Sequence, residues 1–223
     1  MRYGLQIGSK FYQDGTAKKY PGNTVIADVE RGNPAYAVIQ NLREVLQGGM
    51  TGPCFIFLPD DSYHMTVIRG LNDYVRDKDF WPAALAQDMP MAQVDDYFEE
   101  RVKKISMPEE IHMAFDQVTI DVHDVRICLR PWDCRQEEVL RSFRDQVADA
   151  LGLRLPGHDS YTYHITLAYV LIIPEGILCK EVEERRMKMD ALLKKQDDFW
   201  LTAPRIAFYN DMLNFYSQRI TRT

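Results

Sequence analysis

Two stretches of the chain repeat one pattern of residue types at an interval of 100 positions, and this repeat constrains the fold more than any other feature. Residues 62–67 read Ser-Tyr-His-Met-Thr-Val, and residues 162–167 read Thr-Tyr-His-Ile-Thr-Leu. The chain has only five histidines, yet two of them occupy the same Tyr-His-apolar-Thr-apolar setting. Alternation of apolar and polar side chains is typical of a β-strand with one buried face. The repeat therefore predicts two similar strands, one in each half of the chain.

Side chains on a strand point alternately to its two faces, so each repeat divides into a polar and an apolar set. His64 and Thr66 share one face of the first strand, about 6–7 Å apart. His164 and Thr166 share one face of the second strand in the same way. The tyrosine before each histidine lies on the opposite, apolar face, where we expect it to pack in the core. A face with an imidazole and a hydroxyl suits the wall of a groove better than a hydrophobic core.

The other segments predict further strands and helices. Turn residues and β-branched runs give strands at 24–29, 54–59, 62–69 and 161–173, a hairpin at 115–131 and two strands at 204–220. Apolar periodicity gives helices at 34–46, over most of 70–107, at 135–153 and at 175–196. Asn33 is a candidate N-cap of the first helix, and Pro34 suits its first position. Strands interleaved with helices that cannot all be parallel crossovers indicate an α+β fold with antiparallel or mixed sheets.

Length and composition bound the class of protein. Residues 1–223 are enough for a single domain built from two similar lobes, and 46% hydrophobic residues allow a sizeable core. The formal net charge of −6 argues against a broad nucleic-acid or membrane surface, although it allows a local positive pocket. No apolar run approaches the roughly 20 residues of a membrane span, and the start lacks a signal-peptide pattern. Four cysteines without zinc spacing suit a reducing compartment, so we expect a cytoplasmic monomer.

Two imidazoles that flank one groove can cleave a phosphoester. A neutral histidine takes a proton from the attacking hydroxyl or water, and an imidazolium protonates the departing oxygen. Both forms are accessible because imidazole titrates near neutral pH. The hydroxyls of Thr66 and Thr166 can donate hydrogen bonds to the non-bridging oxygens, where the transition state holds charge. This chemistry requires no metal and no other cofactor.

The same residues resemble a known family. Residues 64–67 (His-Met-Thr-Val) and 164–167 (His-Ile-Thr-Leu) resemble the duplicated His-x-Thr-x signature of the two-histidine (2H) phosphoesterase superfamily. That superfamily includes RNA 2′,3′-cyclic phosphodiesterases, tRNA-ligase-like enzymes and plant cyclic phosphodiesterases. A single His-x-Thr arises readily by chance, but two with matching apolar flanks on predicted strands form a specific signal. Segments 21–26 and 58–67 further resemble a bacterial and fungal branch of the superfamily.

The resemblance implies both a fold and an activity. The implied fold is bilobal, with a pseudo-two-fold arrangement of two sheets flanked by helices and a central cleft. His64 and His164 would be the catalytic pair, and Thr66 and Thr166 would bind the phosphate. The implied reaction is hydrolysis of a phosphodiester, cyclic and of the 2′,3′ type, on a nucleotide or an RNA end. Either histidine can serve as the acid.

Two other functions fit the same residues. A non-catalytic module could hold a nucleotide or an RNA end in the same cleft without cleaving it. A metal-dependent hydrolase could recruit His112, His123 or His158 to the pair, because zinc needs three or four ligands. We expect these three histidines to be polar surface residues instead, since each follows turn-forming or charged residues.

Two possible roles remain open for each of several residues near the first strand. Asn23 and Thr24 stand at its entry, where they either reach the cleft or only initiate the strand. Lys10, Lys18 and Lys19 flank the N-terminal turns and either supply positive charge near a phosphate or lie in solvent. We expect the three lysines to lie in solvent.

Overall fold

A computed structural model describes residues 2–219. Its helices and strands follow one another as β1 (Gly22–Asp28), α1 (Pro34–Gln47), β2 (Phe55–Phe57), β3 (His64–Asn72), α2 (Met91–Val102), β4 (Glu110–Ile120), β5 (Asp124–Pro131), α3 (Cys134–Leu151), β6 (Tyr163–Val170), α4 (Ile177–Leu193), β7 (Phe199–Thr202) and β8 (Arg205–Tyr209). Short 3₁₀ turns, Gly52–Cys54 and Asp60–Ser62, precede β2 and β3. Within the described residues, no helix combines the length and the apolar character needed to cross a membrane.

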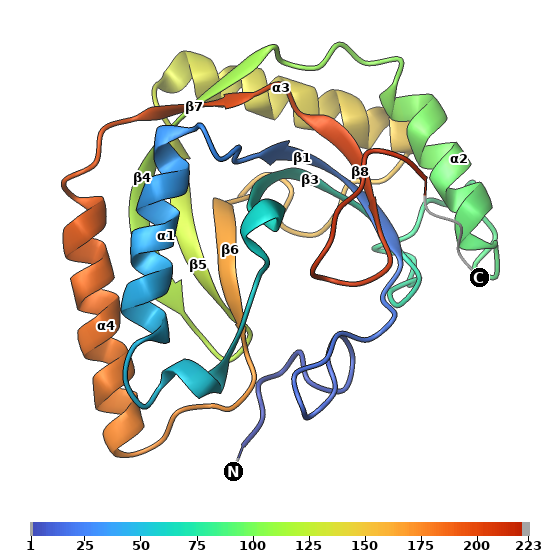
Figure 1. Ribbon diagram of the computed structural model, residues 1–223. Coiled ribbons are helices and arrows are strands. Elements are labelled where there is room, and N and C mark those ends of the chain that lie inside the picture. Colours follow the sequence, from blue (N-terminus) through green and yellow to red (C-terminus); the bar gives the residue numbers. More distant parts are fainter. Residues whose placement is uncertain (1, 220–223) are drawn as a thin grey trace.

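The strands form one curled antiparallel sheet, with the order β7-β4-β5-β6-β3-β1-β8 and with β2 paired to β6 (Figure 1). This arrangement confirms the predicted α+β fold. The two histidine strands, β3 and β6, are neighbours that pair through Met65 and Ile165. We expected two sheets, and the structure shows them as two halves of one sheet because this central pair joins them.

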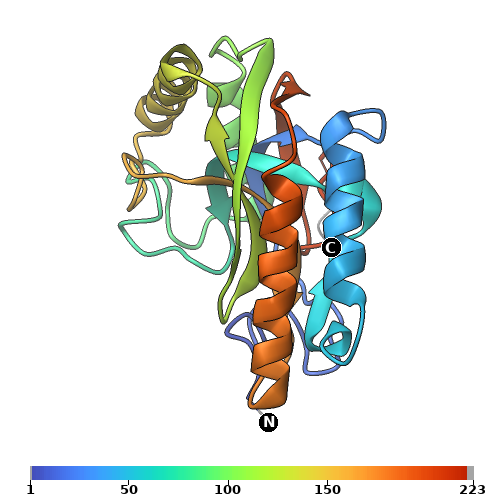
Figure 2. The same ribbon diagram turned by 90° about the vertical axis from the view of Figure 1, so that its left-hand side faces the viewer.

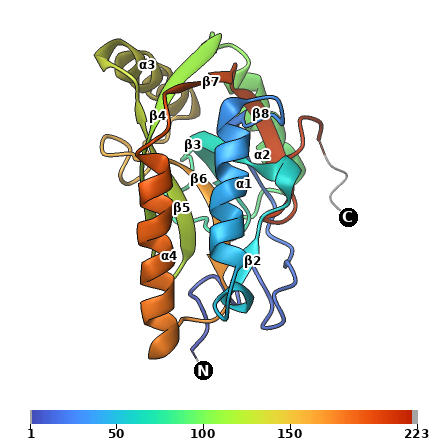
Figure 3. The same cartoon turned by 60° about the vertical axis from the view of Figure 1, so that its left-hand side comes forward.

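The helices cover the apolar face of the sheet in two pairs. α1 packs against α4, and the two stand side by side in Figures 2 and 3. α2 packs against α3 near β1 and β3. The N-terminal segment and the loop after β8 approach the sheet without a helix (Figure 1), where Phe11 contacts Tyr169 and Phe215 contacts His64.

Local sequence signals explain where the two best-predicted helices begin and end. Asn33 caps α1 by accepting a hydrogen bond from the Ala35 amide over 2.9 Å, and Pro34 fills the first helical position. Asp133 caps α3 by accepting from the Gln136 amide over 2.7 Å. Gly152 ends α3 in the left-handed conformation, with φ of 62°, which favours glycine. Both helices lie within one or two residues of their predicted bounds.

Of the predicted helical region 70–107, the part around α2 (Met91–Val102) is confirmed and the part before it is wrong. β3 continues to Asn72, and the chain then turns irregularly until α2 begins at Met91. Hydrogen bonds from the Arg76 guanidinium to the Gln87 and Met89 carbonyls, each 2.7 Å long, hold this segment. Buried Trp81 gives it a small core of its own. Tertiary contacts therefore stabilise a loop where charge and periodicity alone favour a helix.

The C-terminal region also differs from the expectation. β7 was not predicted, and it pairs with β4 at the edge of the sheet. The segment 204–220 forms one strand, β8, followed by a single bridge between Phe208 and Tyr216 rather than a second strand. Its last residue, 220, lies outside the described residues. β7 is held by its pairing with β4, a contact between distant segments that no local pattern indicates.

Candidate active site

β3 presents the first histidine on its polar face. Burial alternates along the strand, with Tyr63, Met65 and Val67 buried and with His64 and Thr66 partly exposed. The Tyr63 hydroxyl accepts a hydrogen bond from Arg43 on α1 over 2.9 Å, which places the apolar face against the helices. His64 and Thr66 consequently face the side that the helices leave open.

β6 repeats the arrangement with the same alternation. Tyr163, Ile165 and Leu167 are buried, and His164 and Thr166 between them are partly exposed. The Arg144 guanidinium of α3 lies 4.0 Å from the centroid of the Tyr161 ring and 6.0 Å from that of Tyr163. Each histidine strand therefore has a tyrosine and a helix-borne arginine on its apolar side.

A local two-fold axis relates the two motifs. Met65 lies directly opposite Ile165 in an antiparallel pair, and such a pair has its two-fold axis between the opposed residues. Rotation about that axis exchanges His64 with His164 and Thr66 with Thr166. Residues on one face at diagonal positions of such a pair lie about 7–8 Å apart, with their Cβ atoms somewhat closer. Both imidazoles and both hydroxyls thus border one region of the sheet surface.

Each motif is followed by a β-bulge at the same position. Thr66 pairs with Ile26 and Ile68 with Val25, which leaves Val67 as the extra residue of β3. Thr166 pairs with Arg126 and Ala168 with Val125, which leaves Leu167 as the extra residue of β6. A bulge shifts the alternation by one residue. Arg69 and Tyr169, which follow the bulges, therefore lie on the histidine face.

Backbone hydrogen bonds fix the tautomer of both rings. The His64 Nδ1 lies 2.7 Å from the Ser62 carbonyl, and the His164 Nδ1 lies 3.2 Å from the Thr162 carbonyl. A carbonyl oxygen only accepts, so Nδ1 carries the proton and donates in both rings. Nε2 of each neutral ring then holds a free lone pair. The two histidines share a protonation pattern suited to proton transfer through Nε2.

Burial makes His64 a weak base in the ligand-free protein. Desolvation lowers the pKa of His64 to about 4, an effect that the Ser62 hydrogen bond and the Asp28 carboxylate oppose. The Phe215 ring, centred 4.3 Å from the His64 ring, contributes to this burial. Asp28 is itself held by Arg205, whose Nη2 donates to Oδ1 over 3.0 Å. This ion pair leaves little net charge beside His64.

Burial also lowers the pKa of His164, and positive charge adds to the effect. Arg126 and Arg69 both disfavour the imidazolium, whereas Asp124 favours it. Arg126 lies opposite Thr166 on β5 and forms an ion pair with Asp124 over 3.0 Å. Both imidazoles are therefore neutral near pH 7, and a bound anion would raise the pKa of each.

The other three histidines lie in separate surroundings. His112 on β4 stacks between Trp132 and Trp200, with ring centroids 5.0 and 4.0 Å away. Asp198 also bonds to its Nε2. His123, in the turn before β5, has its Nδ1 3.2 Å from the Gln6 amide nitrogen. None of these contacts involves the two motifs.

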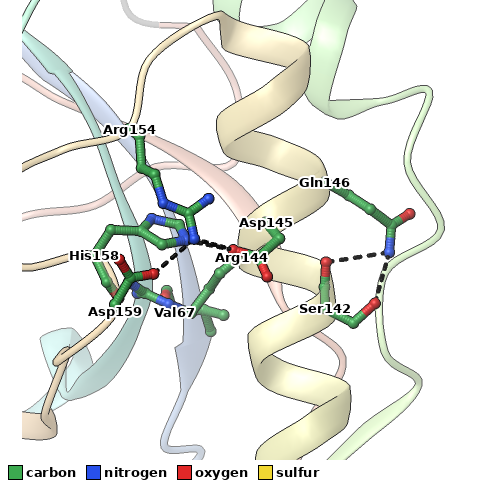
Figure 4. A network of polar contacts seen from close by, with 8 residues as sticks. All are labelled: Val67, Ser142, Arg144, Asp145, Gln146, Arg154, His158 and Asp159. Carbon is green, nitrogen blue, oxygen red and sulfur yellow. Dashed lines mark hydrogen bonds and ion pairs between the residues drawn. The ribbon is translucent and has the colours of Figure 1, made fainter.

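The expectation that His158 is a surface residue is wrong, because its exposed fraction is 8%. Its Nε2 bonds to Asp145 over 2.8 Å, and its carbonyl accepts from the buried Arg144 (Figure 4). His158, Asp145 and Asp159 form the one cluster of three potential metal ligands among residues 2–219. The Arg154 guanidinium already bonds to both carboxylates, over 2.9 and 2.6 Å, and so occupies the position of a cation. This cluster serves as an ion-pair network and gives no support to a metal bound by the histidine pair.

Asn23 and Thr24 have structural roles. Both are buried, with exposed fractions of 0% and 5%. Asn23 donates to Asp95 on α2 over 2.9 Å and accepts from the Leu71 amide over 2.8 Å. The close approach requires Gly70, since a Cβ there would lie 2.3 Å from the Asn23 Oδ1. The docking of α2 therefore explains Asn23, and the Thr24 hydroxyl donates to the Ile68 carbonyl of β3 over 3.0 Å.

The sequence analysis did not identify the cations on the histidine face of the sheet. Arg126 and Arg69 carry no motif, and only the strand register shows that they share the histidine face. Lys10, expected to be solvated, is substantially desolvated, and its Nζ lies 5.7 Å from the centroid of the Tyr169 ring. Lys18 instead donates to the Gly8 carbonyl within its own loop. The available signal was the alternation of faces in the predicted hairpin 115–131, which assigns Arg126 to one face of its strand.

Comparisons with known proteins agree with this architecture. A conserved protein of unknown function from Agrobacterium tumefaciens, ATU0111, superposes with a TM-score of 0.82 at 24% identity, covering 98% of this chain and 93% of that one. LigT of E. coli in its apo form superposes with a TM-score of 0.50 at 10% identity, covering 91% and 96%. These likenesses concern the fold. No curated protein matches the sequence.

A family model gives the assignment. The model described as 2H-phosphodiesterase, a domain of unknown function (DUF1868), matches residues 10–122, which is half of the chain and includes the first motif. The second motif lies beyond the matched residues, on a strand that the local two-fold axis relates to the first. The chain belongs to this 2H-phosphodiesterase family, and through it to the two-histidine phosphoesterase superfamily.

Proposed function

We propose that the protein is a phosphoesterase that hydrolyses a cyclic phosphodiester of the 2′,3′ type on a nucleotide or an RNA end. The observation that carries the proposal is the pair of imidazoles with matching Nδ1 hydrogen bonds on one face of adjacent strands. Both Nε2 lone pairs are thereby available to one substrate. Because a single chain supplies both histidines, residues 1–223 would act as one domain and as a monomer.

The reaction needs one proton acceptor and one proton donor. One histidine takes a proton from water at Nε2 while the water oxygen forms a bond to phosphorus. The bond from phosphorus to the 2′ or 3′ oxygen breaks, and the second histidine, as imidazolium, protonates that oxygen. The product is a phosphomonoester with a free neighbouring hydroxyl. The hydroxyls of Thr66 and Thr166 would donate to the non-bridging oxygens, where charge is held.

The substrate itself would set the protonation states. Burial lowers the pKa of both rings in the free protein, so neither is charged near pH 7. A phosphate anion within hydrogen-bond distance favours the imidazolium and raises the pKa of the nearer ring. The pair would then hold one proton, which is the state that acid/base catalysis requires.

The test is hydrolysis of nucleoside 2′,3′-cyclic phosphates in the presence of EDTA. We expect His64→Ala and His164→Ala each to lower kcat/KM by about 100-fold or more, because each removes a general acid or base. His123→Ala is the matched control, since His123 bonds to Gln6 outside the motifs, and it should retain wild-type activity. Full activity in either motif variant, or loss of turnover on chelation, would contradict the two-histidine mechanism.

A non-catalytic binding module is the second candidate. The observation that favours it is the pKa of about 4 for His64, because this buried ring carries no proton to donate near pH 7. Such a module would bind cyclic and linear phosphodiesters saturably without turnover. A bell-shaped dependence of rate on pH would instead identify an enzyme.

A further inference from the structure

Three cations lie on or beside the histidine face of the sheet. Arg69 from β3 and Arg126 from β5 act on the charge of His164, and Lys10 from the N-terminal segment lies beside the Tyr169 ring. The register places Arg126 opposite Thr166, and the bulges place Arg69 and Tyr169 on the same face. Asp124, Arg126 and Arg69 all affect the pKa of Lys10 and that of His164, so the three cations and one carboxylate lie in one region. This concentration contrasts with the net charge of −6 for the whole chain.

Two of the three cations have no counter-ion of their own. Asp124 is occupied by Arg126, with oxygen to nitrogen distances of 3.0 and 2.5 Å. Within residues 2–219, neither Lys10 nor Arg69 has a carboxylate within the 4.0 Å of an ion pair. Arg69 makes only a long hydrogen bond, 3.4 Å, to the Pro156 carbonyl. Most other arginines with a long-range contact are paired, as Arg43 is with Asp60 and Arg205 with Asp28.

The unpaired ammonium of Lys10 is held in a desolvated position. Its Nζ lies 5.4 Å from the Tyr20 ring centroid and 5.7 Å from that of Tyr169. Aromatic faces attract a cation and restrict the movement of its side chain. Burial of a charge without a partner costs free energy, and an arriving anion would offset that cost. Lys10 is thus placed to receive a negative group near the end of β6.

The His64 side of the histidine pair differs in charge from the His164 side. His64 borders the Asp28–Arg205 ion pair and the Phe215 ring, where positive and negative charges cancel. His164 borders Arg126 and Arg69 with one carboxylate, Asp124, between them. A substrate with a second anionic group would therefore bind with that group on the His164 side.

We propose that Lys10, Arg69 and Arg126 bind a second phosphate group of the substrate, adjacent to the one that the two histidines cleave. The inference rests on the proposed function, because the first phosphate fixes where the second one lies. Arginine offers a planar fork that matches phosphate oxygens, and lysine adds a point charge. The second phosphate is either the terminal phosphate of a mononucleotide or the next phosphodiester of an RNA end.

Three substrates distinguish a terminal phosphate of a mononucleotide from the next phosphodiester of an RNA end. Hydrolysis is compared for adenosine 2′,3′-cyclic phosphate, for the same nucleotide with a 5′-phosphate, and for a trinucleotide that ends in a 2′,3′-cyclic phosphate. The wild type should prefer at least one of the two phosphate-bearing substrates by about tenfold in kcat/KM, through a lower KM. In the Lys10→Met and Arg69→Gln variants, the ratio of kcat/KM with and without the second phosphate should fall toward one. Equal kcat/KM for all three substrates, or an unchanged preference in both variants, would overturn the proposal.

A binding measurement keeps the subsite separate from catalysis. Calorimetric titration should show that pyrophosphate binds about tenfold more tightly than inorganic phosphate, and that Lys10→Met removes the difference. Lys188→Met, on the exposed surface of α4, makes the same change in net charge and should preserve it. Equal affinities for the two anions in the wild type would reject the subsite. Hydrolysis that survives loss of both histidines would instead reject the proposed function.

Discussion

The ring of Phe215 packs against the imidazole of His64 and contributes to its burial. The Phe215 ring belongs to the loop after β8 and lies 4.3 Å from the imidazole, while its carbonyl accepts from Arg205 over 3.2 Å. Burial, to which this ring contributes, disfavours the imidazolium and keeps the pKa of His64 near 4. A residue 151 positions away in the chain thus contributes to the burial of this histidine.

Removal of that ring should raise the pKa. We expect Phe215→Ala to admit water beside His64 and to move its pKa from about 4 upward, toward the 6.5 of a free imidazole. The imidazolium is stable below the pKa, so the ring would become protonated at higher pH than in the wild type. NMR titration of the His64 ring protons measures this directly.

Tyr216→Ala is the matched control for that titration. Tyr216 follows Phe215 and is 48% exposed, so its loss should leave the His64 titration unchanged. An unshifted pKa in Phe215→Ala would show that other groups bury the histidine.

At the residue scale, the sequence predicts the four motif residues but not their surroundings. Alternation along a strand assigns His64 and Thr66 to one face from the chain alone, because it depends only on backbone geometry. Lys10, Arg126 and Phe215 reach the same place through register and loop path, which depend on contacts between distant segments. No local pattern encodes those contacts, so these residues were missed or read as surface.

The bulges of β3 and β6 determine which residues after the motifs lie on the histidine face. A bulge leaves backbone groups outside the regular ladder, and both bulges have external partners for them. The Val67 carbonyl accepts from the buried Arg144 over 2.8 Å, and the Leu167 carbonyl accepts from the Leu58 amide over 3.2 Å. Arg144 also donates to the His158 carbonyl, so α3 holds the bulge and the loop before β6 together (Figure 4).

Loss of Arg144 should weaken the first bulge. We expect Arg144→Met to lower the free energy of unfolding by about 2–4 kcal/mol, because two buried carbonyls lose their donor. Urea denaturation measures the loss. Arg141→Met on the same helix is the comparison, since Arg141 pairs with Glu137 on the surface and should contribute less than about 1 kcal/mol. Equal stability of the two variants would show that the bulge does not depend on Arg144.

Among the elements, those with end signals in the sequence were predicted best. α1 and α3 have capping residues and terminal glycines that act within one helical turn, and their bounds follow from them. The segment 73–90 has charge and apolar residues but no such signals, and packing around Trp81 decides its path. β7 pairs with β4 at the edge of the sheet, a contact between distant segments that the local sequence does not indicate.

For the whole molecule, the link between the two halves of the sheet is narrow. Met65 and Ile165 form the one ladder pair between β3 and β6 in residues 2–219, and both have exposed fractions of 0%. The main core cluster nevertheless includes residues of both halves. Shared packing of the two apolar faces therefore joins the halves more extensively than hydrogen bonds do.

The molecule should unfold as one unit. We expect Ile165→Ala to cost about 2–5 kcal/mol, as cavity formation does in a buried core, without separating the transition into two. Calorimetry, together with fluorescence and circular dichroism, checks whether one transition accounts for all signals. Two resolved transitions would show that the halves are independently stable.

The two-fold relation between the motifs has a consequence for the direction of the reaction. A symmetric pair of histidines has no head or tail, so by itself it would accept a phosphodiester in either of two opposite orientations. The neutral ion pair beside His64 and the excess cations beside His164 remove that equivalence. Under the proposed function, the regiochemistry of cleavage, whether the 2′ or the 3′ ester opens, is determined by charge placed outside the motif. A relative with the same histidines and a reversed distribution of cations would open the other ester.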